Sequence, residues 1–348
     1  MFTRAIALSA VVATSTLGLA GIPAHAGSAP PLPTATNGHK VHLFASGLKT
    51  PTSFAFGDGA VFEGDGGNSE GSAPPNGGVF LLKGGKATEI PGSPQFVAGL
   101  AWHHGALYVS GGSVTDTGVA WTLSRWTGWT GKKFKHQKTI FTAPWKKFDG
   151  FNGLGFGANG RLYVGVDVGL TDGNDHGPAS TSPHVYQILS FTPNGKHHKM
   201  FARGIRQPWQ MVFPAGSNSP YVTDLGQDSG ATNPPDFILR VKAGQNYGFP
   251  KCNRTSGSAC SGFAKPWRRF HPHTDLMGIG LRSRHLYLTS FQGPKAKGPG
   301  GEVYSLSLKG HTLKPLIKGF VAPTVGLGIH GDYLYVGELT GQVFRLKL

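Results

Sequence analysis

The chain has 348 residues, with 54 Gly, 25 Pro and only 5 Glu beside 12 Asp, and these proportions disfavour a helical bundle. No long segment has helical periodicity, which disfavours a doubly wound α/β fold, and a hydrophobic fraction of 39% is too high for a disordered chain. The formal net charge of +16 is scattered along the chain without a basic stripe or a recognisable module, which argues against nucleic acid as a partner.

The first 26 residues have the pattern of a secretory signal peptide. Arg4 provides the positive charge, residues 5–20 are largely apolar, and cleavage is expected after Ala26. No later segment is apolar enough to cross a bilayer, so we expect a secreted protein that does not span the membrane. For such a protein, the basic charge favours attraction to anionic polymers of the cell envelope.

Residues 27–38 (GSAPPLPTATNG) are predicted to form a flexible linker before a single domain over residues 39–348. Cys252 and Cys260 are the only cysteines, and they bracket a polar stretch. An exported protein favours a disulfide between them, whereas two cysteines make a poor metal site and no CxxC redox motif is present.

An internal repeat indicates the fold. An apolar run containing Gly, a polar turn and a strand that usually reads Leu-Tyr-Val recur in copies that begin at residues 52, 98, 152, 209, 277 and 325. Each copy continues with a third strand and most with a fourth. The residues aligned at the centre of the six copies are Val61, Tyr108, Tyr163, Tyr221, Tyr287 and Tyr335. Their spacing is typical of β-propeller blades.

The last copy ends after its third strand, and residues 40–51 offer the missing fourth strand. We therefore predict an all-β fold, a six-bladed β-propeller of four-stranded antiparallel blades, closed by an N-terminal strand that completes the last blade. Links between second and third strands are mostly long, and links between first and second strands are short. Because all second-to-third links emerge on one face, we expect the functional site there.

Four segments carry a resemblance to a known family: residues 204–213 (GIRQPWQMVF), 221–230 (YVTDLGQDSG), 234–252 (PPDFILRVKAGQNYGFPKC) and 264–281 (AKPWRRFHPHTDLMGIGL). They resemble the soluble glucose/sorbosone dehydrogenases, which are six-bladed propellers. Members of this family use pyrroloquinoline quinone (PQQ) and calcium to oxidise aldoses or related sugars. The resemblance implies a small sugar as substrate and an external electron acceptor.

The resemblance also implies roles for individual residues. Arg206 and the adjacent Gln207 match positions that face the cofactor and substrate. Gly226 and Gln227 match the loop whose carbonyl groups hold calcium. Asp236 matches the first acid of a pair that stabilises this loop or binds a further calcium ion.

Basic residues have counterparts in the family as well. His273 matches a histidine of the sorbosone-type subgroup. Lys295 and Lys297 lie in the loop where the family supplies cations for the carboxylates of the quinone. A tricarboxylated quinone requires cations, and a hard metal ion requires oxygen ligands.

Three positions depart from the family pattern. Asp149 stands where the family has its general-base histidine, Gln207 replaces an Asn, and Phe237 replaces the second acid. Asp149 or His273 would have to accept the proton. An exposed Asp has a pKa of about 4 and is a weaker base than His at neutral pH.

Two other functions stay open at this point. One is a non-catalytic propeller that lost the base and binds an envelope glycan or a protein partner. The other is a hydrolase or lyase that holds calcium through Asp149, Asp167 and Asp224.

Overall fold

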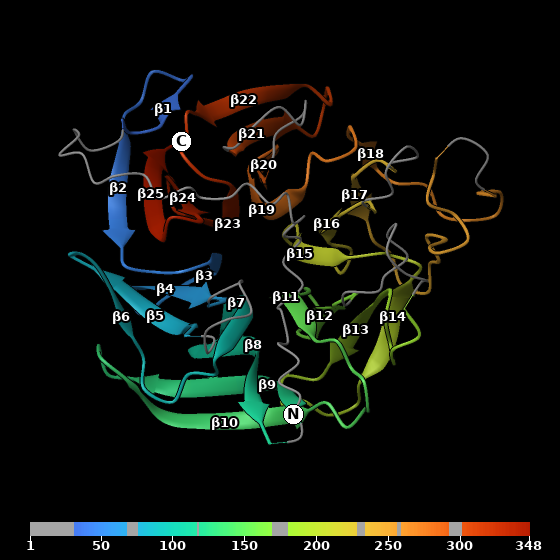
Figure 1. The fold of residues 1–348 in the computed structure, drawn as a ribbon, viewed down its shortest axis with the longest axis horizontal. Coiled ribbons are helices and arrows are strands. Elements are labelled where there is room, and N and C mark those ends of the chain that lie inside the picture. Colours follow the sequence, from blue (N-terminus) through green and yellow to red (C-terminus); the bar gives the residue numbers. More distant parts are fainter. Residues whose placement is uncertain are drawn as a thin grey trace, which may run out of the picture.

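The computed structural model describes residues 31–67, 76–116, 118–168, 180–227, 234–255, 259–291 and 301–348. These ranges contain strands and no helix, and hence no helix that could cross a membrane. The strands form six four-stranded antiparallel units, called blades here, arranged around a common centre (Figure 1). The all-β propeller predicted from the repeats is confirmed.

Each blade is described from its innermost to its outermost strand. Blade 1 contains β3 (Pro51–Gly57), β4 (Ala60–Asp65), β5 (Gly78–Lys83) and β6 (Gly85–Glu89). Blade 2 contains β7 (Phe96–His103), β8 (Ala106–Thr115), β9 (Gly118–Trp129) and β10 (Phe134–Thr142). Blade 3 contains β11 (Phe151–Phe156), β12 (Leu162–Val166), β13 (Gln187–Phe191) and β14 (Lys199–Arg203).

The second half of the chain continues the pattern. Blade 4 contains β15 (Pro208–Val212), β16 (Tyr221–Asp224), β17 (Phe237–Arg240) and β18 (Arg268–Arg269). Blade 5 contains β19 (Leu276–Arg282), β20 (His285–Ser290), β21 (Glu302–Ser307) and β22 (Leu313–Lys318). Blade 6 contains β23 (Thr324–His330), β24 (Tyr333–Glu338), β25 (Gln342–Lys347) and β2 (Val41–Ser46).

The start of the chain joins blades that are far away in sequence. Strand β2 pairs antiparallel with β25, with Val41 opposite Leu346, and thereby forms the outer strand of blade 6. Its end also pairs in parallel with β6, so blades 6 and 1 share one eight-stranded sheet. Strand β1 (Thr34–Ala35), inside the segment expected to be a linker, pairs with β22 of blade 5.

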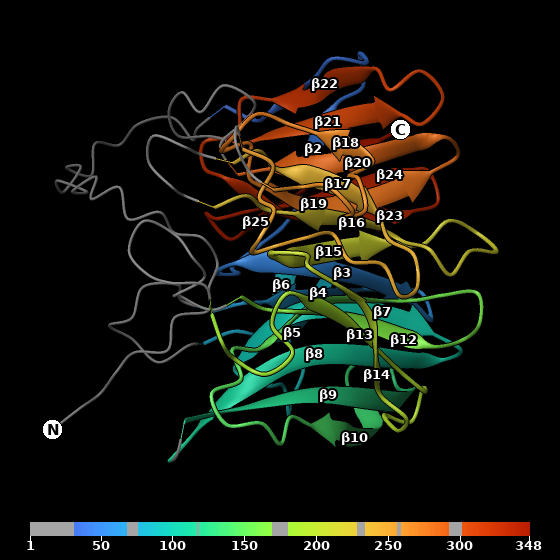
Figure 2. The ribbon, with the colours of Figure 1, turned by 90° about the vertical axis from the view of Figure 1, so that its right-hand side faces the viewer.

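The innermost strands close the ring. Each of β3, β7, β11, β15, β19 and β23 contacts the innermost strand of the next blade, and β23 contacts β3. Figure 2 shows the ring from the side, with the strands running between two faces. We call the face that bears the links from second to third strands the long-loop face, and the opposite one the short-turn face. The long-loop face is the one where the sequence predicts the functional site.

Strand register corrects one detail of the repeat alignment. Phe62 lies opposite Ala55, just as Tyr108 lies opposite Ala101 in the second repeat. Phe62, not Val61, is therefore the equivalent of Tyr108. The alignment is off by one residue because the first copy has Phe in place of Tyr and is followed by the buried acid Glu63, where the other copies have Val or Leu.

Small and hydroxyl side chains let neighbouring blades approach closely. The side chain of Ser110 donates a hydrogen bond to the carbonyl of Asn152 in the next blade, at 2.7 Å. Thr223 and Thr289 form the corresponding bonds in blades 4 and 5, to Met277 and Val325. The glycines of the apolar runs have a related role, since a Cβ on Gly99 would lie 2.8 Å from the Cα of Gly153.

Gln210 breaks this glycine pattern at the centre of the ring. It stands in blade 4 at the position where four other repeats have Gly. Its Nε2 donates to the carbonyl of Ala98 at 2.9 Å and lies 3.4 Å from that of Thr52, in blades 2 and 1. Because blade 1 lies opposite blade 4 in a ring of six, this side chain bridges the axis of the propeller.

Candidate functional site

Blade 4 brings most of the predicted site residues together at the long-loop face. Arg206 and Gln207 precede β15, Asp224 ends β16, and Gly226 follows it. Asp236 lies just before β17. These positions meet because β15, β16 and β17 are adjacent antiparallel strands whose links emerge at the same end of the blade.

Arg206 is buried, with 3% of its surface exposed, and it binds the loop after β16. Its Nη1 donates to the carbonyl of Gly226 at 2.5 Å and to that of Leu225 at 3.1 Å. The side-chain oxygen of Gln207 also accepts from this nitrogen, at 3.2 Å. The guanidinium therefore supplies positive charge to the carbonyl that the resemblance assigned to calcium.

Asp236 ties this loop to blade 5. Its Oδ1 accepts from the N–H of Gly226 and its Oδ2 from the N–H of Asp275, both at 2.6 Å. Burial raises the pKa of Asp236 to about 6, although these two hydrogen bonds and the charges of Arg206 and His273 act in the opposite direction. Both carboxylate oxygens thus hold backbone groups of neighbouring loops.

Asp224 is a buried acid that the leading interpretation of the sequence did not include. Its Oδ1 accepts from the N–H of Gln207 at 2.9 Å, and burial raises its pKa to about 7 despite this bond and the charge of Arg206. The acids at the ends of β4 and β24 have the same role, since Asp65 accepts from Thr50 and Glu338 from Ala322. Because an acid recurs at the end of the second strand in several blades, the sequence could have indicated that Asp224 has this role.

Asp149 lies elsewhere on the same face, in the link between β10 and β11 of blade 3. It is half-buried, and Ser180 donates to its Oδ2 at 3.3 Å. Burial raises the pKa of Asp149, while the nearby hydroxyl of Ser182 and the hydrogen bond from Ser180 oppose the shift. The expectation of an exposed Asp with an ordinary pKa is therefore wrong.

The aromatic ring of Tyr186 connects the surroundings of Asp149 with blade 4. Its hydroxyl accepts from the N–H of Ser180 at 2.6 Å, and its ring contacts Phe249 with centroids 4.7 Å apart. Burial, together with the charge of Asp149, raises the pKa of Tyr186 to about 12. Tyr186 therefore stays protonated at neutral pH.

His273 lies in the link between β18 and β19, near enough to Asp236 for its charge to lower the pKa of that acid. Its backbone has a φ of 55°, in the left-handed region. Lys295 and Lys297 lie outside the described residues, as do residues 1–30 with the predicted signal peptide. The structure thus groups Arg206, Gly226, Asp236 and His273, and it places Asp149 in a separate cluster.

The predicted disulfide is present. Cys252 and Cys260 are bonded, with their Cα atoms 4.9 Å apart. The segment that they bracket carries Asn253 and Arg254, which were not predicted as site residues. Both residues lie inside the short loop closed by the disulfide, next to the segments that carry the family resemblance. This position was the sequence signal that could have marked them as site residues.

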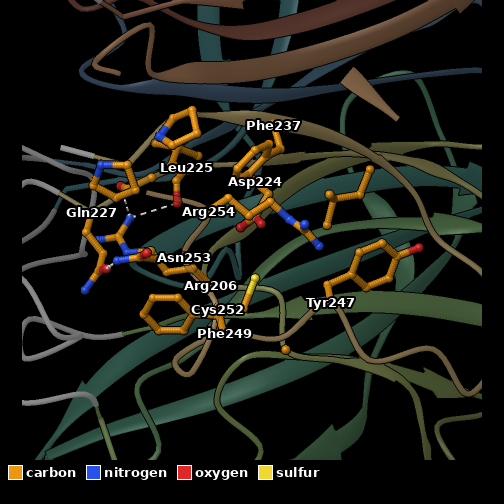
Figure 3. A pocket seen from close by; sticks show the side chains of 15 residues that line it. Arg206, Asp224, Leu225, Gln227, Phe237, Tyr247, Phe249, Cys252, Asn253 and Arg254 are labelled. Atoms are coloured by element: carbon orange, nitrogen blue, oxygen red, sulfur yellow. Dashed lines mark hydrogen bonds between the residues drawn. The ribbon is translucent and has the colours of Figure 1, made fainter. Parts of the chain in front are cut away.

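Asn253, Arg254 and Cys252 line a pocket together with Arg206 and Gln227 (Figure 3). Asp224 also lines the pocket, and its remaining walls are largely apolar, with Phe237 and Leu239 among them. The cavity volume is about 20 Å³, which is room for about one water-sized group. Asn253 Nδ2 donates to the side-chain oxygen of Gln227 at 3.2 Å. The pocket therefore combines two guanidinium groups and two amides with the buried carboxyl group of Asp224.

These donors can be compared with the two groups that the resemblance implies. They do not fit calcium, because Arg206 already binds the Gly226 carbonyl and Asp236 accepts two backbone N–H groups. The guanidinium and amide groups suit one carboxylate of a quinone such as PQQ. Burial raises the pKa of Asp224 in the same lining to about 7, and protonation of this acid would reduce its repulsion of such a group. A cavity of this size would take one oxygen atom of such a group and not a whole ring system.

The proposed calcium cluster of the hydrolase or lyase interpretation is not formed. Within the described ranges, no three His, Cys, Asp or Glu residues lie close enough to hold a metal ion. Asp224 accepts from Gln207, and Asp167 accepts from the adjacent N–H of Val168 at 2.6 Å. Each acid accepts a hydrogen bond from a backbone N–H of its own blade. The expectation that they share a metal ion with Asp149 is therefore wrong.

Comparison of the sequence with models of protein families and with curated proteins finds no match. Solved structures do match. The PQQ-bound aldose sugar dehydrogenase of Streptomyces coelicolor has a TM-score of 0.65 at 18% identity, over 91% of this chain and 99% of that chain. An oxidoreductase of Thermus thermophilus, described as a glucose dehydrogenase, has a TM-score of 0.68 at 17% identity, over 89% and 100%.

The apo form of the soluble aldose sugar dehydrogenase of Escherichia coli has a TM-score of 0.64 at 15% identity, over 88% of this chain and 98% of that chain. The chain is thus structurally similar to sugar dehydrogenases over most of its length. At these identities the similarity establishes the shared propeller fold.

Proposed function

We propose that the protein is an exported oxidoreductase that oxidises an aldose or a related sugar at the long-loop face of the propeller. The observation that carries this proposal is the environment of Asp149. It stands at the general-base position of the resemblance, it is half-buried, and burial raises its pKa. A base with a pKa nearer to neutrality is better matched to accepting a proton from a sugar hydroxyl.

Asp149 would accept the hydroxyl proton, and the hydroxyl of Ser180 would orient its carboxylate. Tyr186 holds the backbone of Ser180 and so fixes this arrangement. A bound PQQ would act as the hydride acceptor. Arg206, Arg254, Gln227 and Asn253 would hold one of its carboxylates, without calcium at Gly226.

The test is a calorimetric titration of PQQ into the purified mature protein, in EDTA and then with added calcium. We expect saturable binding in both conditions, and sugar oxidation with an artificial electron acceptor once PQQ is bound. Arg254→Gln should weaken PQQ binding, while Arg284→Gln, outside this pocket, should not. A folded protein that binds no PQQ in either condition would overturn the proposal.

One observation favours a second candidate, a propeller that binds a glycan without catalysis. Arg206, which the resemblance directs toward the cofactor, is instead 3% exposed and bound to Gly226 and Leu225. In that case a sugar would bind the long-loop face with no PQQ present. Glycan binding that is unchanged by Arg254→Gln would support this candidate.

A further inference from the structure

A second cavity lies far from the long-loop face, between blades 2 and 3 at the short-turn end. It is bounded by the β7–β8 turn, the outer strands β9 and β10, and the turn after β13, and its volume is about 480 Å³. That space is much larger than the pocket beside Arg206 and suits a small ligand or part of a polymer.

The lining of this cavity is strongly basic. It contains Arg125 and Lys138, together with His103, His104 and His136. No Asp or Glu lies among its lining residues, and the third wall contributes only Pro193 and Asn194. The cavity therefore has at least two positive charges without a carboxylate in its walls to neutralise them.

The arrangement of the two permanent cations is unfavourable for the free protein. Arg125 on β9 lies directly opposite Lys138 on β10, so both side chains project from the same face of the sheet. Like charges at directly opposite positions destabilise an antiparallel pair. A bound anion would remove this repulsion.

Arg125 is also held in place. Its Nε donates to the hydroxyl of Tyr108 at 3.1 Å, and Tyr108 is 2% exposed. No described residue accepts a hydrogen bond from its two Nη atoms, which leaves the bidentate side of the guanidinium for a ligand. On the adjacent wall, His103 stacks on Phe156 with centroids 3.9 Å apart and contacts His104.

Protection of an edge strand explains only part of this pattern. Lysines on an outermost strand prevent edge-to-edge pairing, and β10 is the outermost strand of blade 2. That role accounts for Lys138 but not for Arg125 on β9. It also does not account for His103 at the end of β7 and His104 in the turn that follows. Basic groups from three separate segments converge on one cavity.

We propose that this cavity binds the carboxylate, sulfate or phosphate groups of an acidic polysaccharide. Arg125 would hold one anionic group through its Nη atoms, and Lys138 would add a point charge beside it. His103, His104 and His136 would add ring N–H donors beside these two cations. The site would attach the protein to an anionic glycan while the long-loop face stays accessible.

The test measures binding of oligogalacturonate, sulfated dextran and neutral dextran of similar length to the mature protein by calorimetry at low salt. We expect both acidic probes to bind and neutral dextran not to bind. Preference for one acidic probe would distinguish carboxylate from sulfate. If neither acidic probe binds the folded protein, the proposal is wrong.

Two matched double variants distinguish binding at this cavity from non-specific attraction to a basic protein. Arg125→Gln with Lys138→Gln should weaken binding about tenfold or more, since a charged hydrogen bond and a nearby charge are lost. Lys132→Gln with Lys133→Gln removes the same charge from the neighbouring β9–β10 turn and should change affinity less than about twofold. Equal losses in both variants would overturn the proposal. Thermal unfolding of both variants checks that they fold.

Discussion

The Nη1 atom of Arg206 lies 2.5 Å from the carbonyl oxygen of Gly226, so the two residues that the resemblance assigned to cofactor and metal bind one another. The guanidinium is buried beside Asp224 and Asp236, and its charge lowers the pKa of both acids. Arg206 thus links the loop after β16 to the segment that enters β15. In this chain the guanidinium of Arg206 is the cation that contacts the Gly226 carbonyl.

We therefore predict that the fold does not depend on calcium. Neither EDTA nor added calcium should change the midpoint of thermal unfolding. Arg206→Ala should lower the free energy of unfolding by about 3 kcal/mol or more, because it leaves buried acids without their cation. Urea denaturation measures this loss, with Arg203→Ala, at an exposed position of β14, as the control. A large stabilisation by calcium would contradict the assignment.

Asp149 makes a prediction about pH. Because burial raises its pKa, the carboxylate is ready to accept a proton only at pH values above this raised value. The kcat/KM for sugar oxidation should therefore fall as the pH decreases through the raised pKa. Asp149→Asn should lower kcat about a hundredfold or more. Asp149→His should have the activity that Asp149→Asn loses. In this variant the acid limb of the pH profile should move toward the pKa of histidine. An unchanged pH profile in Asp149→Asn would exclude it as the base.

Asp224 and Asp236 predict how stability depends on pH. Their pKa values in the folded protein, about 7 and about 6, lie above the unfolded value of 3.8. Between these limits the folded state binds more protons than the unfolded state. The free energy of unfolding should therefore decrease as the pH rises from about 4 to about 7.

Asp224→Asn tests this dependence, since its amide oxygen can still accept from Gln207 while its charge is removed. The slope of stability against pH should be shallower in Asp224→Asn. The exposed Asp58→Asn is the control and should leave the slope unchanged. Urea denaturation across this pH range gives both slopes, and identical slopes in all three proteins would refute the prediction.

Gln210 should contribute to stability by bridging the axis. Gln210→Ala removes its bond to the Ala98 carbonyl and leaves space at the centre of the ring, so we expect a loss of about 1–2 kcal/mol. Gln137 donates a similar bond at 2.8 Å to Pro91, but it is exposed. Gln137→Ala should therefore cost less. Equal losses for the two variants would mean that the position on the axis has no special importance.

The six repeats, their four-stranded pattern and the disulfide could be predicted from the sequence because they depend on local alternation, turn residues and spacing. The strand register was harder to predict. Phe62 was aligned one residue away because the first copy lacks the Tyr that marks the others. Glu63 at an apolar position gave no sign of its burial, which follows from the packing of blade 1.

Only the tertiary structure decided how the site residues meet. Arg206 and Gly226 lie close enough in sequence to suggest one site, but the direction of the guanidinium determines that it binds a carbonyl of its own chain. Gln210 reaches a residue 112 positions away because the ring closes. The basic cavity arises where two blades meet. Such contacts depend on ring geometry and side-chain direction, which no local pattern contains.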